Sequence, residues 1–190
     1  MSAQPQPQFA SALQPLWNSV GSAGIVNLDD VPNVEFQNSI VKLKGFDVIV
    51  NSKAARVSAN FPIEKVQAVV RYEVTPDPGL IADEAGIALR IYCRRGHGDI
   101  QAKLIRVPIP SSPTSSVEEH MLITYNNSHT DRLPFYVDLS DPFQGSGGPV
   151  FDFVNNSYYI ELTLSAQHLA AMPLTEPPEV ALLHLVTQFE

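Results

Sequence analysis

Apolar and polar residues alternate in short runs along most of the chain after residue 33. These runs, rich in β-branched and aromatic residues, cover residues 34–44, 46–50, 65–74, 86–94, 100–109, 121–125, 133–139, 150–154, 158–164 and 180–189. Clusters of turn-forming residues such as 75–79 and 96–99 separate them. About ten short strands with almost no helical periodicity predict an all-β fold. We expect an antiparallel, jelly-roll-like β-sandwich, with a closed β-barrel as the alternative.

The first 33 residues follow a different pattern. Residues 1–8 form a Gln/Pro-rich leader, and a leader of this composition is expected to be extended. Four apolar residues then follow at a spacing near one helical face, namely Phe9, Leu13, Leu16 and Trp17. Pro15 limits any helix there to a turn or two. The sequence therefore predicts a leader, a short helical turn and a loop over residues 1–33, followed by a single β-sandwich domain over residues 34–190.

Composition narrows the possible partners. The 190 residues carry 12 basic and 20 acidic side chains, a formal net charge of −8, and the first 41 residues contain no Lys or Arg. Because binding to a phosphate backbone needs clustered basic residues, no nucleic-acid partner is expected. No apolar run is long enough to cross a bilayer and no signal peptide is recognisable. We therefore expect no membrane partner and a cytoplasmic location.

Two histidine–aspartate pairs are the candidate metal ligands. His97 lies two residues before Asp99, and His129 lies two residues before Asp131. In an extended segment, residues two apart project from the same face. Imidazole and carboxylate together suit a divalent metal such as Zn, Fe or Mn. The four residues define a possible metal site, although the favoured interpretation is a protein without a cofactor.

Ser146 is the only candidate nucleophile with a motif around it. It lies in Gln-Gly-Ser-Gly-Gly-Pro, which resembles the Gly-Asp-Ser-Gly-Gly-Pro segment of chymotrypsin-like proteases. Gly145 replaces the aspartate of that motif, and only 49 residues separate His97 from Ser146. A serine nucleophile needs a base within hydrogen-bond reach, and this interval is too short for the two-barrel fold of those proteases. No catalytic residue is assigned, and a role other than catalysis is favoured.

The basic residues suggest a protein interface. Five of them fall within residues 86–109, which are predicted to form a hairpin, namely Arg90, Arg94, Arg95, Lys103 and Arg106. Arg90 and Arg94 share strand parity and so lie on one face. Such a positive face could meet an acidic patch on an identical chain, or be an ordinary solvated sheet face. We take Arg90, Arg94 and Arg95, together with Phe9, Leu13, Leu16 and Trp17, as the candidate interface.

Two resemblances accompany this interpretation. The segment Asn-Ser-Val-Gly-Ser-Ala-Gly-Ile-Val at residues 18–26, followed by Asp29 and Asp30, resembles the opening of a scattered set of small, uncharacterised bacterial proteins with β-rich bodies. That resemblance implies a bacterial, all-β protein and transfers no site. The length and strand-rich body also resemble single jelly-roll capsid proteins, although the basic arm of such proteins is missing.

These observations predict a non-enzymatic β-sandwich with a structural role. It would act through protein–protein contacts and assemble into a homo-oligomer. The alternative is a small-molecule-binding protein or a metal-dependent jelly-roll or barrel enzyme, of the cyclase or isomerase type.

Overall fold

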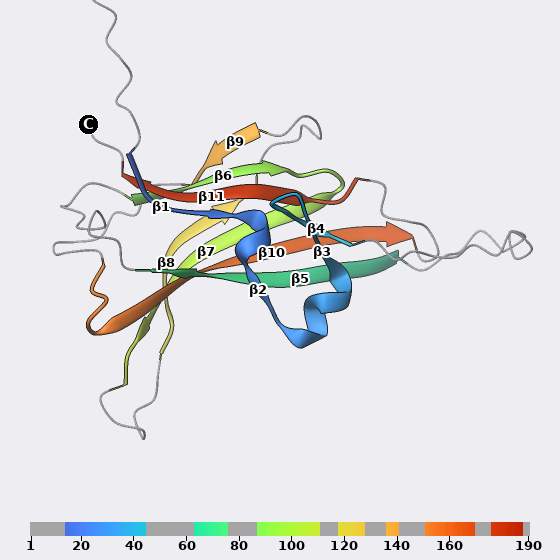
Figure 1. Ribbon diagram of the computed structural model, residues 1–190. Helices are drawn as coiled ribbons and strands as arrows, with labels where there is room; N and C mark the ends of the chain where they lie inside the picture. Colours follow the sequence, from blue (N-terminus) through green and yellow to red (C-terminus); the bar gives the residue numbers. More distant parts are fainter. Residues whose placement is uncertain are drawn as a thin grey trace, which may run out of the picture.

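The computed structural model describes residues 14–44, 63–75, 87–110, 118–127, 136–140, 151–169 and 176–187. About 70% of these residues are in β-strands, which form two antiparallel sheets facing each other (Figure 1). Neither sheet closes into a barrel. The predicted antiparallel sandwich is therefore confirmed.

The two sheets are named A and B here. Sheet A contains β1 (Gln14–Val20), β3 (Val34–Gln37), β4 (Ile40–Leu43), β6 (Ile87–Arg94), β9 (Tyr136–Leu139) and β11 (Glu179–Thr187). Sheet B contains β2 (Ile25–Val26), β5 (Ile63–Val74), β7 (Gly98–Pro108), β8 (His120–Asn126) and β10 (Asn156–Leu169). Two 3₁₀ helices, η1 (Gly21–Ala23) and η2 (Leu28–Asn33), flank β2. Within the described ranges, no helix has the length and hydropathy that crossing a bilayer would require.

The eight strands from β4 to β11 pair as a jelly roll. β4 pairs with β11, β5 with β10, β6 with β9, and β7 with β8, as though one long hairpin had been rolled up. The resulting orders are β4-β11-β6-β9 in sheet A and β5-β10-β7-β8 in sheet B. The chain therefore changes sheet at every connection in this region except the one between β7 and β8. Two interlocked Greek keys of this kind define the jelly roll.

The predicted hairpin over residues 86–109 is wrong, because β6 belongs to sheet A and β7 to sheet B. The connection between them passes through Gly96, whose φ of +58° is easily reached only without a side chain. Cys93 on β6 and Ile100 on β7 are both fully buried in the core between the sheets. A glycine-rich turn between two apolar runs looks the same in the sequence whether the strands pair or switch sheets. Consequently Arg90 and Lys103 lie on different sheets.

The helical turn predicted for residues 9–18 is also wrong where the structure describes it. Gln14–Val20 is strand β1, which pairs antiparallel with β11. Pairing with a long neighbouring strand outweighs the local helical spacing. Trp17, which was expected to dock on a partner, is only 8% exposed and belongs to the core. Phe9 and Leu13 lie outside the described residues. Strands β1 and β2 contain residues that the sequence assigned to the helical turn and the loop.

The inner faces of the sheets form one continuous hydrophobic core. Alternate residues of the central strands are buried there, including Val66, Ala68, Val70, Tyr72 and Val74 on β5 and Tyr158, Ile160, Leu162, Leu164 and Ala166 on β10. This period of two is the geometry of a strand with one face in the core. It leaves the outer faces of the two sheets as the surfaces on which a function can reside.

Candidate functional site: the outer face of sheet A

A row of apolar side chains crosses the outer face of sheet A. Val20, Leu182, Tyr92 and Val137 lie in register on the four adjacent strands β1, β11, β6 and β9. Directly opposed residues of neighbouring strands project from the same face. Val20 is 38% exposed, Tyr92 39% and Val137 46%, and Leu182 is half-buried. The row is therefore an apolar stripe open to solvent.

A second row, with polar members, runs beside this stripe. Asn18, His184, Arg90 and Leu139 are in register on the same four strands. Between the two rows lies a hollow of about 220 Å³, named here the sheet A groove. Five side chains line it, those of Arg90, Tyr92, Val137, Leu182 and His184.

The electrostatics of the sheet A groove are positive. No carboxylate pairs with Arg90 in the part of the chain that the structure describes. Burial lowers the pKa of His184 below its ordinary value, and the positive charge of Arg90 lowers it further. An uncompensated guanidinium between apolar walls is an arrangement suited to a carboxylate, because a charge-assisted hydrogen bond gains strength where water is partly excluded.

The other two arginines of the predicted interface already have acidic partners. Arg94 forms an ion pair with Glu179 on β11. Arg95 bonds Asp99 at 2.9 Å through its guanidinium and the backbone carbonyl of Gly98 at 2.8 Å. Of the three arginines, Arg90 is the one that lies in the sheet A groove.

The predicted metal ligands are only partly described. His97 Nε2 lies 3.6 Å from Glu176 Oε2, and Asp99 is paired with Arg95. His97 and Asp99 line a polar hollow together with Lys65 and Arg95. The positive charges of Lys65 and Arg95 would disfavour a metal cation there. Among the described residues no three His, Cys, Asp or Glu side chains gather as a metal site would require. His129 and Asp131 lie outside the described residues, and the four-residue metal site stays a prediction.

A buried polar cluster ties the two sheets together at the β8 and β9 edge. The hydroxyl of Tyr125 on β8 donates to Asp138 Oδ2 on β9 at 3.0 Å and lies 3.7 Å from Cys93 Sγ on β6. Burial raises the pKa of the Cys93 thiol, so the reactive thiolate is disfavoured. Cys93 and Tyr125 are almost completely inaccessible to solvent. The cluster is therefore structural and offers no open nucleophile.

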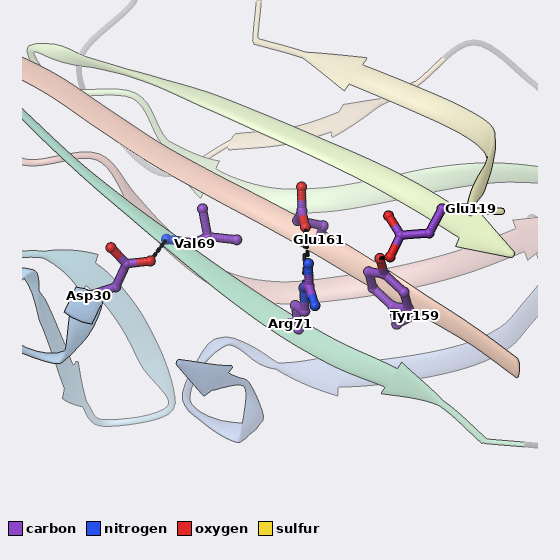
Figure 2. A network of polar contacts seen from close by, with 6 residues as sticks. All are labelled: Asp30, Val69, Arg71, Glu119, Tyr159 and Glu161. Atoms are coloured by element: carbon purple, nitrogen blue, oxygen red, sulfur yellow. Dashed lines mark hydrogen bonds and ion pairs between the residues drawn. The ribbon is translucent and has the colours of Figure 1, made fainter. Parts of the chain in front are cut away.

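The outer face of sheet B is polar where β5 and β10 cross it (Figure 2). Arg71 binds Glu161 Oε2 through two nitrogens at 3.0 and 3.2 Å and lies over the Tyr159 ring at 4.9 Å. The Tyr159 hydroxyl donates to Glu119 at 2.8 Å. Burial, together with this bond to Glu119, raises the pKa of Tyr159 to about 12. These polar side chains form hydrogen bonds and ion pairs with one another. The apolar stripe on sheet A, in contrast, leaves apolar side chains exposed to solvent.

Sequence reasoning missed most of the sheet A groove. Strand parity placed Arg90 on the outer face, and the same parity would have added Tyr92. The remaining groove residues Val137, Leu182 and His184 come from β9 and β11, which lie far away along the chain. Their neighbourhood depends on strand pairing, and no local signal in the sequence encodes it.

The chain matches no protein-family model, no curated protein and no solved structure significantly.

Proposed function

We propose that this chain is a non-enzymatic jelly-roll protein that assembles with copies of itself, and that the sheet A groove is part of the contact. The observation that carries the proposal is the apolar row in which Val20, Tyr92 and Val137 are exposed and Leu182 is half-buried. It lies beside Arg90, which has no acidic partner among the described residues. Apolar side chains aligned on one face and rimmed by polar groups are typical of interaction sites. Tyrosine and arginine are also among the residues that are enriched at the positions contributing most binding energy in interfaces.

The shape of the groove favours a protein over a small molecule. Small-molecule pockets are usually concave and hold about 300–1,000 Å³, whereas this groove of about 220 Å³ lies on a sheet surface. Cys93 and Tyr125 are closed to a substrate. A side chain from another protein, inserted between Tyr92 and Arg90, matches the size and chemistry of the groove.

Self-association is favoured over a foreign partner by the charge balance. With 20 acidic against 12 basic residues, another copy supplies many carboxylates that can pair with Arg90. The overall repulsion between chains of charge −8 is screened within about 10 Å at moderate ionic strength. The affinity between two copies then depends on the local apolar contact and on the ion pair between Arg90 and a carboxylate of the other copy.

The test is the mass of the protein as a function of concentration, measured by light scattering and native mass spectrometry from about 1 to 100 μM. We expect assemblies heavier than the 20.8 kDa monomer, and a return to monomer in Val137→Asp, which places a charge in the stripe. The matched control is Val154→Asp, because Val154 is 84% exposed outside the groove. A wild-type monomer at every concentration would overturn the proposal.

A further inference from the structure

A second apolar surface lies on β2 and η2. Ile25, Leu28 and Val31 are 71%, 87% and 53% exposed, and Asp29 is exposed among them. These four residues are named here the η2 knob. In Figure 1, β2 and η2 project from the edge of sheet B, on the side away from β1, β6, β9 and β11. The knob and the sheet A groove therefore face in different directions.

The η2 knob is held in place by hydrogen bonds to the sheet. Asp30 Oδ2 accepts from the backbone N–H of Val69 at 3.1 Å, and Asn33 Nδ2 donates to the carbonyl of Gln67 at 3.2 Å. Within η2, the N–H groups of residues 30 and 31 both donate to the carbonyl of Asn27. A surface fixed before contact loses less conformational entropy on binding.

The knob and the groove complement each other in chemistry. The knob presents three aliphatic side chains and the Asp29 carboxylate, which has no basic partner among the described residues. The groove presents apolar walls and the Arg90 guanidinium, which has no acidic partner there. Each surface combines exposed apolar side chains with one charged group, the negative Asp29 on the knob and the positive Arg90 in the groove.

We propose that the η2 knob of one copy docks in the sheet A groove of the next, with the Asp29 carboxylate against the Arg90 guanidinium. This inference rests on the proposed self-association and specifies its contact. Because two different surfaces meet, the contact is heterologous, and an open assembly keeps one free knob at one end and one free groove at the other until it closes. Such contacts generate rings, or open chains where the rotation does not close.

Two surface variants test the contact. Leu28→Asp disables the knob and Val137→Asp disables the groove. Both side chains are exposed, so we expect both variants to fold, which circular dichroism checks. We expect each variant to be monomeric alone. An equimolar mixture should give a 1:1 dimer and nothing larger, because only one intact knob and one intact groove remain. If Leu28→Asp assembled like the wild type, the contact would be overturned.

A charge exchange tests the Asp29–Arg90 pair itself. Asp29→Arg and Arg90→Asp should each weaken assembly about tenfold or more, and the double variant should recover most of the loss. The control for the change in net charge is Glu118→Arg, which alters an exposed acid outside both surfaces. Failure of the double variant to recover would overturn the pairing.

The outcomes separate this inference from the proposed function. If the wild type is monomeric, self-association and the knob contact fail together. If the wild type assembles, Val137→Asp dissociates it and Leu28→Asp does not, self-association through the groove stands and the knob is not its occupant. A 1:1 dimer from the mixed variants supports both.

Discussion

The carboxylate of Asp30 accepts a hydrogen bond from the backbone N–H of Val69, with 3.1 Å between Oδ2 and N (Figure 2). Strand β5 is 12 residues long, but β2 pairs only with its residues Val70 and Arg71. Asp30 and the neighbouring Asn33 bond the next part of this edge from η2. The side chains of Asp30 and Asn33 thus bond backbone groups that a neighbouring strand would otherwise bond. A sheet edge covered in this way is less able to pair with a strand of another chain.

Replacing Asp30 with alanine should lower the free energy of unfolding by about 1–2 kcal/mol, because the partly buried N–H of Val69 loses a charged acceptor. Urea denaturation measures the loss, and amide hydrogen exchange at Val69 should accelerate. Asn27→Ala is the control, since the exposed Asn27 side chain makes no capping hydrogen bond. Equal stability of the two variants would show that Asp30 does not protect this edge.

The contact between Tyr125 and Asp138 should also contribute to stability. Tyr125→Phe removes the hydroxyl that joins β8 to β9 and leaves the Asp138 carboxylate with one donor fewer. We expect a loss of about 1–2 kcal/mol in the free energy of unfolding, measured with urea, because the lost bond lies in the partly buried edge of the core.

Tyr159→Phe is the matched comparison for Tyr125→Phe. The Tyr159 hydroxyl also bonds a carboxylate, that of Glu119, but this hydrogen bond is open to solvent. Water replaces the lost partner there, so we expect a change below about 0.5 kcal/mol. A larger loss at Tyr159 than at Tyr125 would contradict the structural role of the buried cluster.

Cys93 should be unreactive in the folded protein. Its side chain is fully buried, and burial raises the pKa of the thiol and so suppresses the thiolate. Ellman's reagent should modify the native protein very slowly and modify Cys93 fully in denaturant. A Val154→Cys variant provides an exposed thiol for comparison, since Val154 is 84% exposed. Rapid modification of Cys93 in native buffer would show that the core opens readily.

The strands and their buried faces could be predicted because they follow from local alternation. Cys93 shares strand parity with Leu89 and Ile91, and all three are completely inaccessible to solvent. The turn at Gly96 was also visible in the sequence. The sequence did not show that this turn leads the chain from sheet A to sheet B. The backbone of Glu176, a residue far along the chain, lies so close to Gly96 that a Cβ there would be 2.2 Å from its carbonyl oxygen. Sheet switching is set by such distant contacts.

The candidate site was less predictable than the fold for the same reason. Strand parity places Arg90 and Arg94 on one face, yet only the pairing of β11 with β4 and β6 puts Glu179 beside Arg94. The same pairing puts His184 beside Arg90. The sequence of one segment predicted a positive face with two arginines. In the structure Arg94 is paired with Glu179, and Arg90 lies in the apolar groove.

The stability of the protein should depend on the protonation of His184. Burial and then the charge of Arg90 lower its pKa below the ordinary value of 6.5. The unfolded chain therefore binds this proton more readily than the folded one, and acid favours unfolding. The destabilisation is absent well above pH 6.5, develops as the pH falls through 6.5, and is complete below the folded pKa. His184→Gln should remove this part of the pH dependence of the urea midpoint.

Nuclear magnetic resonance titration of the imidazole measures the shift of His184 directly. The Leu28→Asp background is suitable, because this exposed change lies outside the groove and is expected to keep the chain monomeric. We expect a midpoint below 6.5 for His184, and a higher midpoint in Arg90→Gln, where the neighbouring charge is gone. Since burial is the larger cause, Arg90→Gln should restore only part of the difference. A midpoint at or above 6.5 with Arg90 intact would mean that neither burial nor the Arg90 charge disfavours the protonated imidazole of His184 in the groove.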